Sequence, residues 1–87
     1  MSRSKREFKV ILRVKELRES KGMSSLVLSK RAGLYQSQLS SLESGKTEPM
    51  ISTLVLLALA LDCSIDDLID MEKTSEGIQE WEEKLKC

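Results

Sequence analysis

Residue types on which enzymes and metal sites depend are scarce or missing in this chain. Its 87 residues include no His, two Cys, one Pro and four Gly. Without His, and without a nucleophile beside a base or a glycine-rich phosphate loop, the sequence has no catalytic constellation, so we expect a protein that is not an enzyme. Cys63 and Cys87 lack metal-ligand spacing, and we therefore expect no metal and no cofactor. Cys63 lies among apolar residues and is expected in the core.

Aromatic residues and long apolar runs are also scarce. Phe8, Tyr35 and Trp81 are the only aromatic residues, which argues against single-strand binding by base stacking, since that needs several exposed rings. The apolar run at 54–61 is too short to span a bilayer. The basic N-terminus lacks the apolar stretch and cleavage site of a signal peptide. We therefore expect a cytoplasmic protein with no membrane partner.

The formal net charge is zero, but the two halves of the chain carry opposite charge. Residues 1–49 hold 11 Lys and Arg against 5 Asp and Glu, whereas residues 50–87 hold 3 against 9. A protein with one surface toward phosphate and another facing away would have this pattern, although chance segregation of solvated charge is an alternative. Residues 1–9 are expected to form a basic N-terminal arm. Such an arm binds phosphates or the minor groove of DNA, and a solvated tail is the alternative.

The stretch from Ser24 to Lys46 predicts two short helices joined by a tight turn. Gly33 marks the turn, because a helix C-terminus commonly needs the positive φ that glycine adopts without steric cost. Ser24 offers an N-cap oxygen for a helix over 25–32. The second helix is expected over 36–44 and ends at Gly45, while Tyr35 is a poor N-cap for it.

Short neutral side chains occupy the outward face of this second helix. They are Gln36, Ser37, Ser40 and Ser41. A helix with one leucine face and one face of Gln and Ser suits the reading of base edges. An ordinary helical hairpin with a polar outer face fits the spacing equally well.

The remaining elements are predicted from periodicity and cap residues. Residues 8–13 combine strand-like alternation with a helical stripe, so the helix expected over 10–21 has either a helical or an extended first turn. Further helices are expected from Ser52 or Thr53 to Leu61, from a cap at Ser64 to about Met71, and over 75–86 in the acidic tail. A loop at 46–49 precedes the first of these because Pro49 resists helix.

Taken together, the motifs resemble those of a known family. The segments L-R-x-x-K-G-M-S, A-G-L, L-x-x-L-E-S-G-K, T-L, L-A-x-A-L and S-I-D-D-L-I follow one another with the spacing of the Cro/repressor-type helix-turn-helix family, also called XRE-like or lambda-repressor-like. The resemblance covers about 10–69 without gaps. It implies an all-α fold with a five-helix DNA-binding domain over 10–71. Its third helix would enter the major groove of double-stranded DNA. The tail at 72–87, with the acidic helix predicted above from its periodicity, is an additional element beyond that domain.

The resemblance also assigns roles to individual residues. The base-reading positions fall on Gln36, Ser37, Ser40 and Ser41, and the phosphate-contacting positions fall on Ser25, Tyr35, Gln38 and Lys46. The family's Arg–Glu pair between the first and third helices falls on Arg18 and Glu43. We interpret this pair as structural, because losing one partner would leave a poorly compensated charge.

This chain departs from the family pattern at three positions. Ser25 replaces a Gln whose amide reaches both a phosphate and the recognition helix, and Ser is expected to be too short for that. Ser29 replaces an Ala at a close helix contact, and Tyr35 replaces a Ser or Thr cap. Since the recognition helix has no Arg, while Gln36 suits adenine, we predict modest direct specificity that is supplemented by DNA shape and dimer spacing.

The helix over 54–61 is apolar on all sides. Leu54, Leu57, Ala58 and Leu61 are expected to face the core, whereas Leu56 and Leu59 project away from it. The tail stripe formed by Ile78, Trp81 and Leu85 would fold back over Leu56 and Leu59, or a second copy would bury them across a two-fold axis. A tolerated exposed patch is the third alternative. We predict a homodimer.

The sequence therefore predicts a sequence-specific DNA-binding transcriptional regulator, a repressor that acts as a homodimer on a palindromic operator. Two alternatives keep the same DNA domain. One is an antitoxin, whose acidic tail with Trp81 would bind a protein partner, and the other is a restriction–modification controller protein. A protein-interaction module that uses the motif without DNA belongs to a third class.

Overall fold

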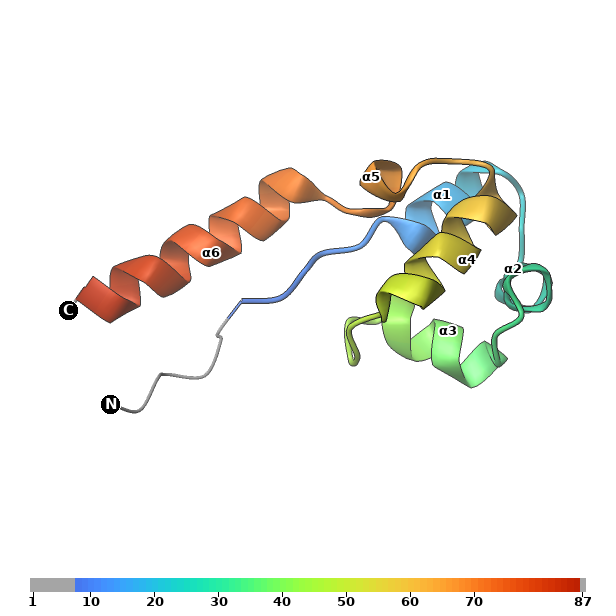
Figure 1. Ribbon diagram of the computed structural model, residues 1–87, viewed down its shortest axis with the longest axis horizontal. Coiled ribbons are helices and arrows are strands. Elements are labelled where there is room, and N and C mark those ends of the chain that lie inside the picture. Colours follow the sequence, from blue (N-terminus) through green and yellow to red (C-terminus); the bar gives the residue numbers. More distant parts are fainter. Residues whose placement is uncertain (1–7, 87) are drawn as a thin grey trace.

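A computed structural model describes residues 8–86, in which all regular structure is helical (Figure 1). The helices are α1 (Val14–Ser20), α2 (Ser25–Ala32), α3 (Gln36–Glu43), α4 (Ile51–Leu61), α5 (Ile65–Leu68) and α6 (Met71–Lys86). Helices α1–α5 gather into one body, and α6 projects from it. The prediction of an all-α, five-helix domain with an additional C-terminal helix is confirmed. Residues 1–7 of the predicted basic arm, and Cys87, lie outside the described residues.

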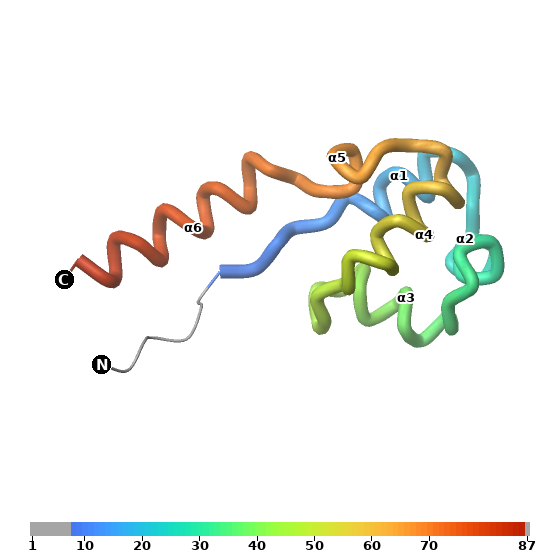
Figure 2. The backbone as a smooth tube through the Cα atoms, viewed as in Figure 1, coloured from blue at the N-terminus to red at the C-terminus, as the bar shows by residue number. Residues whose placement is uncertain are grey.

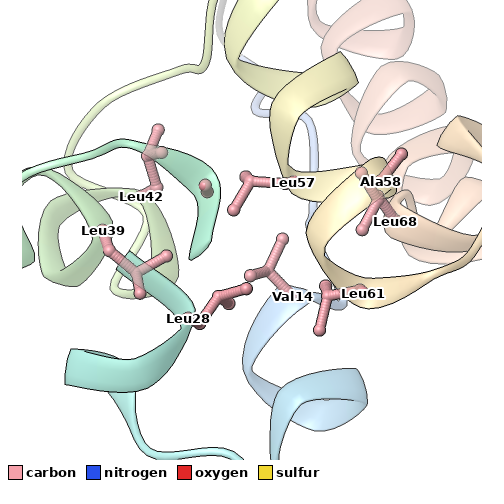
Figure 3. Close-up of a cluster of buried hydrophobic side chains, with 9 residues drawn as sticks. Val14, Leu28, Leu39, Leu42, Leu57, Ala58, Leu61 and Leu68 are labelled. Carbon is pink, nitrogen blue, oxygen red and sulfur yellow. The ribbon is translucent and has the colours of Figure 1, made fainter. Parts of the chain in front are cut away.

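The core of the body consists mainly of leucine side chains, and each of the five helices contributes at least one buried residue to it (Figure 3). The buried apolar residues are Val14, Leu28, Ala32, Leu39, Leu42, Leu57, Ala58, Leu61 and Leu68. Burial of each leucine is worth about 1.5–3 kcal/mol relative to exposure. Cys63 is half-buried against this cluster, as predicted, and burial raises the pKa of its thiol.

The turn between α2 and α3 has the geometry that the sequence predicts. The Ser24 hydroxyl accepts a hydrogen bond from the Val27 N–H at 3.1 Å and caps α2. Gly33 has a φ of 71°, and the Leu34 N–H then donates to the Ser29 carbonyl at 2.8 Å. The Ser29 side chain is buried and donates to the Leu26 carbonyl, so the hydroxyl is satisfied at the close helix contact.

The first helix begins at Val14 rather than at Val10. Residues 8–13 are not helical, so of the two alternatives predicted for the start of this helix the extended one is confirmed. The Arg13 N–H donates to the Leu68 carbonyl, the Asp70 N–H donates to the Ile11 carbonyl, both at 2.7 Å, and Leu12 forms an antiparallel bridge with Ile69. These hydrogen bonds come from a distant part of the chain, and they are available only to an extended backbone.

The same bridge shortens α5 and lengthens the tail helix. Helix α5 begins with the predicted cap, in which Ser64 and Asp67 form a reciprocal capping box, but it ends at Leu68 rather than near Met71 because Ile69 is extended. Helix α6 then starts at Met71 rather than at Ser75. The Asp70 carboxylate accepts a hydrogen bond from the Lys73 N–H at 2.9 Å and caps this start.

Helix α6 lies along the extended segment and not over α4 (Figure 2). The Ile11 N–H donates to the buried Thr74 hydroxyl at 2.9 Å, and the rings of Phe8 and Trp81 are 5.4 Å apart between centroids. Leu56 and Leu59 remain 42% and 74% exposed. The alternative in which the tail folds back over these leucines is therefore wrong, because the extended Ile69 directs the chain away from α4.

Helix α4 spans 11 residues without a single charge and begins at Ile51, slightly before the predicted Ser52 or Thr53. Leu57, Ala58 and Leu61 are buried as predicted, and Leu54 packs against the cluster. Within residues 8–86, no helix has both the length and the apolar character needed to cross a membrane.

Candidate nucleic-acid interface

Helix α3 presents a polar face to solvent and an apolar face to the core. Leu39 and Leu42 are buried, which turns the remaining positions of this short helix outward. Gln36, Ser37, Gln38 and Ser40 are exposed, and Ser41 is half-buried. The residues predicted to read bases therefore lie on one accessible helix face that carries no Lys or Arg.

A hydrogen bond between two polar residues holds the start of α3 to α2. The Gln36 amide nitrogen donates to the Ser25 hydroxyl at 2.9 Å. Ser25 was expected to be too short to reach the recognition helix, and that expectation is wrong because the longer Gln36 side chain crosses the gap instead. A Gln amide group has two N–H donors and an acceptor oxygen. One donor and the acceptor of Gln36 thus stay available, which is the pair that adenine N7 and N6 require.

A charged pair holds the end of α3 to α1. The Arg18 guanidinium donates to both Glu43 carboxylate oxygens, with N···O distances of 2.8 and 3.1 Å, and a third hydrogen bond reaches the Met23 carbonyl at 2.9 Å. The side chains are only 11% and 9% exposed. The hydrogen bond to Glu43 raises the pKa of Arg18, against the opposing effect of burial. This geometry fits a structural pair, because both charges are satisfied internally.

A shallow hollow separates the polar face of α3 from α1. Its lining comprises Lys15, Arg18, Ser25, Gln36, Ser37, Ser40 and Glu43. Arg18 is bound to Glu43, so the exposed Lys15 is the cation that remains to face an anion there. Sequence reasoning missed Lys15. Its position three residues before Arg18, on the same side of a helix, is the signal that would have identified it.

The other residues predicted to contact phosphate lie around α3 and not together. Tyr35 is the N-cap residue of α3, and its side chain makes no cap hydrogen bond, as predicted. Gln38 is exposed within the helix, while Lys46 is exposed after the turn that ends it. The Lys46 N–H donates to the Ser41 carbonyl at 2.9 Å, which fixes the backbone that carries this lysine. The structure thus brings Ser25 and Gln36 together and leaves the other three on the surface.

Comparison with known proteins relates this arrangement to characterised regulators. Residues 14–68 match the profile of the helix-turn-helix family. The HTH-type transcriptional regulator SinR of Bacillus subtilis is 34% identical over 79 residues, which is 85% of this chain and 71% of SinR. The 14–68 match spans α1–α5 and includes all the residues that line the hollow described above.

Solved structures of helix-turn-helix regulators are also similar to this chain. The restriction-modification controller protein C.AhdI from Aeromonas hydrophila has a TM-score of 0.62 and 33% identity, over 63% of this chain and 83% of that one. SinR in complex with DNA has a TM-score of 0.60 and 36% identity, over 62% and 87%. The complex of SinR with SinI has a TM-score of 0.65 and 36% identity, over 85% and 72%. The chain therefore belongs to the Cro/repressor-type, or XRE-like, helix-turn-helix family of DNA-binding transcription regulators.

Proposed function

We propose that this protein represses transcription by binding a palindromic operator as a homodimer, with one α3 helix in the major groove of each half-site. The observation that carries the proposal is the neutral polar face of α3, which is held outward by Arg18–Glu43 at one end and Ser25–Gln36 at the other. The structure of SinR in complex with DNA supports a DNA-binding role for a similar domain.

Within this proposal, Gln36 reads adenine, and Ser37, Ser40 and Ser41 add weaker contacts to base edges. Ser25, Tyr35, Gln38 and Lys46 contact phosphates and set the register of the domain on the duplex. We add Lys15 to this second group, since it is exposed and lines the same hollow as Ser25 and Ser37. Because the base contacts are few, DNA shape and the spacing of half-sites supply part of the specificity.

The homodimer is proposed from the exposed apolar surface. Val55, Leu56 and Leu59 leave the outer side of α4 uncharged and accessible. In the predicted stripe of α6, Leu85 is exposed and Ile78 is half-buried, while Trp81 packs against Phe8. Contiguous apolar patches of this kind on a small domain mark interaction sites more often than scattered exposed leucines do. A two-fold dimer would place the two α3 helices about 34 Å apart, one turn of the duplex.

Selection of bound sites from random duplexes tests the proposal. The expected product is a pair of inverted half-sites whose centres are about 10 base pairs apart. Sedimentation of the protein with the selected duplex should give two chains per site. A selected pool without an enriched sequence would contradict operator recognition, and one chain per site would contradict the dimer.

Two more specific roles keep the same interface. The similarity to C.AhdI supports a controller protein of a restriction–modification system. The complex of SinR with SinI supports a protein partner for a similar chain, and an antitoxin would use the acidic α6 with Trp81 in this way. Neighbouring genes distinguish these roles, since a restriction–modification pair indicates a controller and a small toxin gene indicates an antitoxin.

A protein-interaction module without DNA binding is the remaining class. The dependence of affinity on salt separates it from a DNA-binding regulator. Neutralisation of several phosphates by Lys and Arg makes the logarithm of the DNA affinity fall linearly with the logarithm of salt concentration. Absence of any duplex binding at low salt would favour the protein-interaction module.

A further inference from the structure

A groove lies between the extended segment and the turn that follows α3. One of its walls is formed by residues 8–12, and the other by the end of α3 and the turn at 44–48. In Figure 1 the extended segment runs between α6 and this turn, so the groove lies on the side of the segment that faces away from α6. Its volume is about 510 Å³. Ligand sites have volumes of roughly 300–1,000 Å³, so the groove has room for a bound molecule.

The edge of the extended segment beside this groove has unpaired backbone groups. The N–H and C=O groups of Ile11 and the Arg13 N–H bond to residues 68–74, on the α6 side. Because backbone groups of an extended chain alternate between its two edges, those of Val10 and Leu12 point the other way, toward the groove. In the part of the chain that the structure describes, the backbone groups of these two residues form no hydrogen bond. Another extended chain can pair with an open edge of this kind.

Apolar side chains contribute to the same groove. Phe8, Val10 and Leu12 alternate along the extended segment and therefore share one of its faces. Phe8 and Val10 are half-buried, and Leu12 packs against the core cluster. The buried Leu42 of α3 belongs to the same lining. A segment that pairs with the open edge would place every second side chain beside this apolar surface.

The charges of the groove favour an acidic occupant. Lys9 and Lys46 are exposed on its two walls, and neither forms an ion pair in the described part of the chain. Of the acidic residues in the lining, Glu43 is bound to Arg18, and Glu48 is exposed in the turn. Apart from the internal ion pair, two lysines thus face one carboxylate, so an acidic segment is attracted more than a basic one.

We propose that this groove binds an extended acidic segment of a partner protein, which adds to residues 8–12 as a second strand. Acidic side chains of the segment alternate with apolar ones. The apolar side chains contact the apolar lining, while the acidic ones approach Lys9 and Lys46. Because Lys46 is also proposed to contact phosphate, an occupied groove withdraws this lysine from DNA and weakens duplex binding. That last step rests on the proposed function, whereas binding of the segment does not.

Other parts of this chain suit the groove less well. Residues 1–7 contain three basic residues and one acidic residue, so they have the wrong charge. The acidic residues of the tail lie in α6, where the backbone groups are already bonded within the helix and cannot pair with a strand. A separate protein is therefore the occupant that the open edge and the lysines favour.

Binding of a synthetic peptide to the full chain tests the strand addition. The probe is a capped, dye-labelled hexapeptide of alternating Glu and Val, and fluorescence anisotropy measures its affinity. We expect saturable binding that weakens as the salt concentration rises. The same peptide with methylated amide nitrogens keeps its side chains but lacks N–H donors, so it should bind far more weakly. Absence of binding by the first peptide at millimolar concentration, or equal binding of the two peptides, would overturn the proposal.

Variants at Val10 test the open edge. Val10→Pro removes one N–H donor from this edge and breaks no hydrogen bond of the fold, whereas Val10→Ala keeps the donor and shortens the same side chain. We expect Val10→Pro to weaken peptide binding severalfold more than Val10→Ala does. Equal affinities of the two variants would contradict strand addition, and thermal unfolding shows that both remain folded.

Variants at the lysines test the charge of the occupant. The double replacement of Lys9→Ser and Lys46→Ser is expected to weaken binding of the Glu–Val peptide roughly tenfold. Lys30→Ser, at an exposed lysine of α2 outside the groove lining, is the matched control and should bind like the parent. A peptide of alternating Lys and Val that binds the parent as tightly as the Glu–Val peptide would overturn the acidic class.

Competition with DNA separates this inference from the proposed function. A saturating concentration of the Glu–Val peptide is expected to lower the affinity of the parent for a duplex severalfold, and to have little effect on the duplex affinity of Lys46→Ser. Peptide binding with unchanged duplex affinity would overturn the link to DNA binding. If Val10→Pro weakens duplex binding but not peptide binding, DNA is the occupant and the proposal is overturned. A parent chain that binds the peptide and no duplex would overturn the proposed function alone.

Discussion

The body formed by α1–α5 and the projecting α6 are stabilised in different ways. The body encloses a leucine core, and a buried ion pair ties its first and third helices together. Helix α6 buries only Thr74 and is attached to the body through the extended segment. The body can therefore present a fixed polar face on α3, whereas α6 has the weaker attachment and is expected to open at a lower free-energy cost.

The largest expected effect on the free energy of unfolding comes from removing the ion pair between Arg18 and Glu43. Replacement Arg18→Ala leaves the Glu43 carboxylate largely buried and unpaired, and we expect the free energy of unfolding to fall by about 3–5 kcal/mol. Denaturant unfolding measures this change. The matched control is Arg13→Ala, which removes the solvent-exposed Arg13–Glu16 pair and should leave the unfolding midpoint almost unchanged. Equal losses in the two variants would contradict the structural role of Arg18.

The two sides of α4 provide the next contrast. Leu57 is fully buried and Leu59 is 74% exposed. Replacement Leu57→Ala should reduce the free energy of unfolding by about 2–5 kcal/mol, because it removes buried methyl groups and leaves a cavity. Leu59→Ala should leave the stability of the monomer unchanged when thermal unfolding is followed in dilute solution. A large destabilisation by Leu59→Ala would mean that this side chain packs within its own chain.

Gln36 and Lys46 should differ in the kind of DNA-binding loss. Replacement Gln36→Ala is expected to cost about 1–3 kcal/mol at one base position per half-site and to relax the preference there. Lys46→Ala should weaken binding to all sequences alike and reduce the salt slope by about 1. Competition binding with single-base variants of the selected site measures both effects. If both variants keep the parental preference and strength, the assignment of α3 as the reading helix is wrong.

A smaller effect on the body is expected when α6 is detached. Replacement Phe8→Ala removes the ring that lies 5.4 Å from Trp81. Amide hydrogens of α6 should then exchange faster with deuterium, while the unfolding of the body changes by less than about 0.5 kcal/mol because few body contacts are lost. Unchanged exchange in α6 would show that the helix does not depend on the extended segment.

The smallest effect concerns the capping box of α5. Hydrogen bonds from Ser64 lower the pKa of Asp67 below its ordinary value of 3.8. A group with a lowered pKa in the folded state stabilises the fold above its ordinary pKa, and this contribution is lost as the pH falls through the folded-state pKa. Asp67→Asn should therefore make stability less dependent on pH below 3.8, as followed by acid titration of the unfolding midpoint. An unchanged pH dependence in Asp67→Asn would contradict this contribution of the capping box.

Elements fixed by neighbouring residues were predictable from the sequence, and elements fixed by distant residues were not. The cap at Ser24, the turn at Gly33 and the box at Ser64 each depend on residues within one helical turn, and all three are present. The start of α1 and the end of α5 instead depend on the bridge between Leu12 and Ile69. Local pattern could not identify this pairing, because residues 8–13 have both strand and helix signals.

The same distinction applies to the interface. The outward face of α3 follows from the spacing of Leu39 and Leu42. The contact of Gln36 with Ser25 and the approach of Lys15 to the hollow depend on how separate helices pack, which spacing within one helix does not reveal. The path of α6 was also out of reach, since the apolar stripe indicates that the helix needs a partner surface without identifying the surface.

The extended segment at 8–13 has a consequence for how the chain folds during synthesis. Ile11 bonds to Thr74, which lies 63 positions later. At a translation rate of about 5–20 residues per second, this segment leaves the ribosome several seconds before its acceptor does. Over that interval α1–α4 can assemble, but residues 8–13 lack the hydrogen-bond partners that Leu68, Asp70 and Thr74 supply. Residues 8–13 and α6 therefore pair only after α1–α5 have been synthesised, and a ribosome that stalls beyond α4 would carry a body whose extended segment still lacks its hydrogen-bond partners.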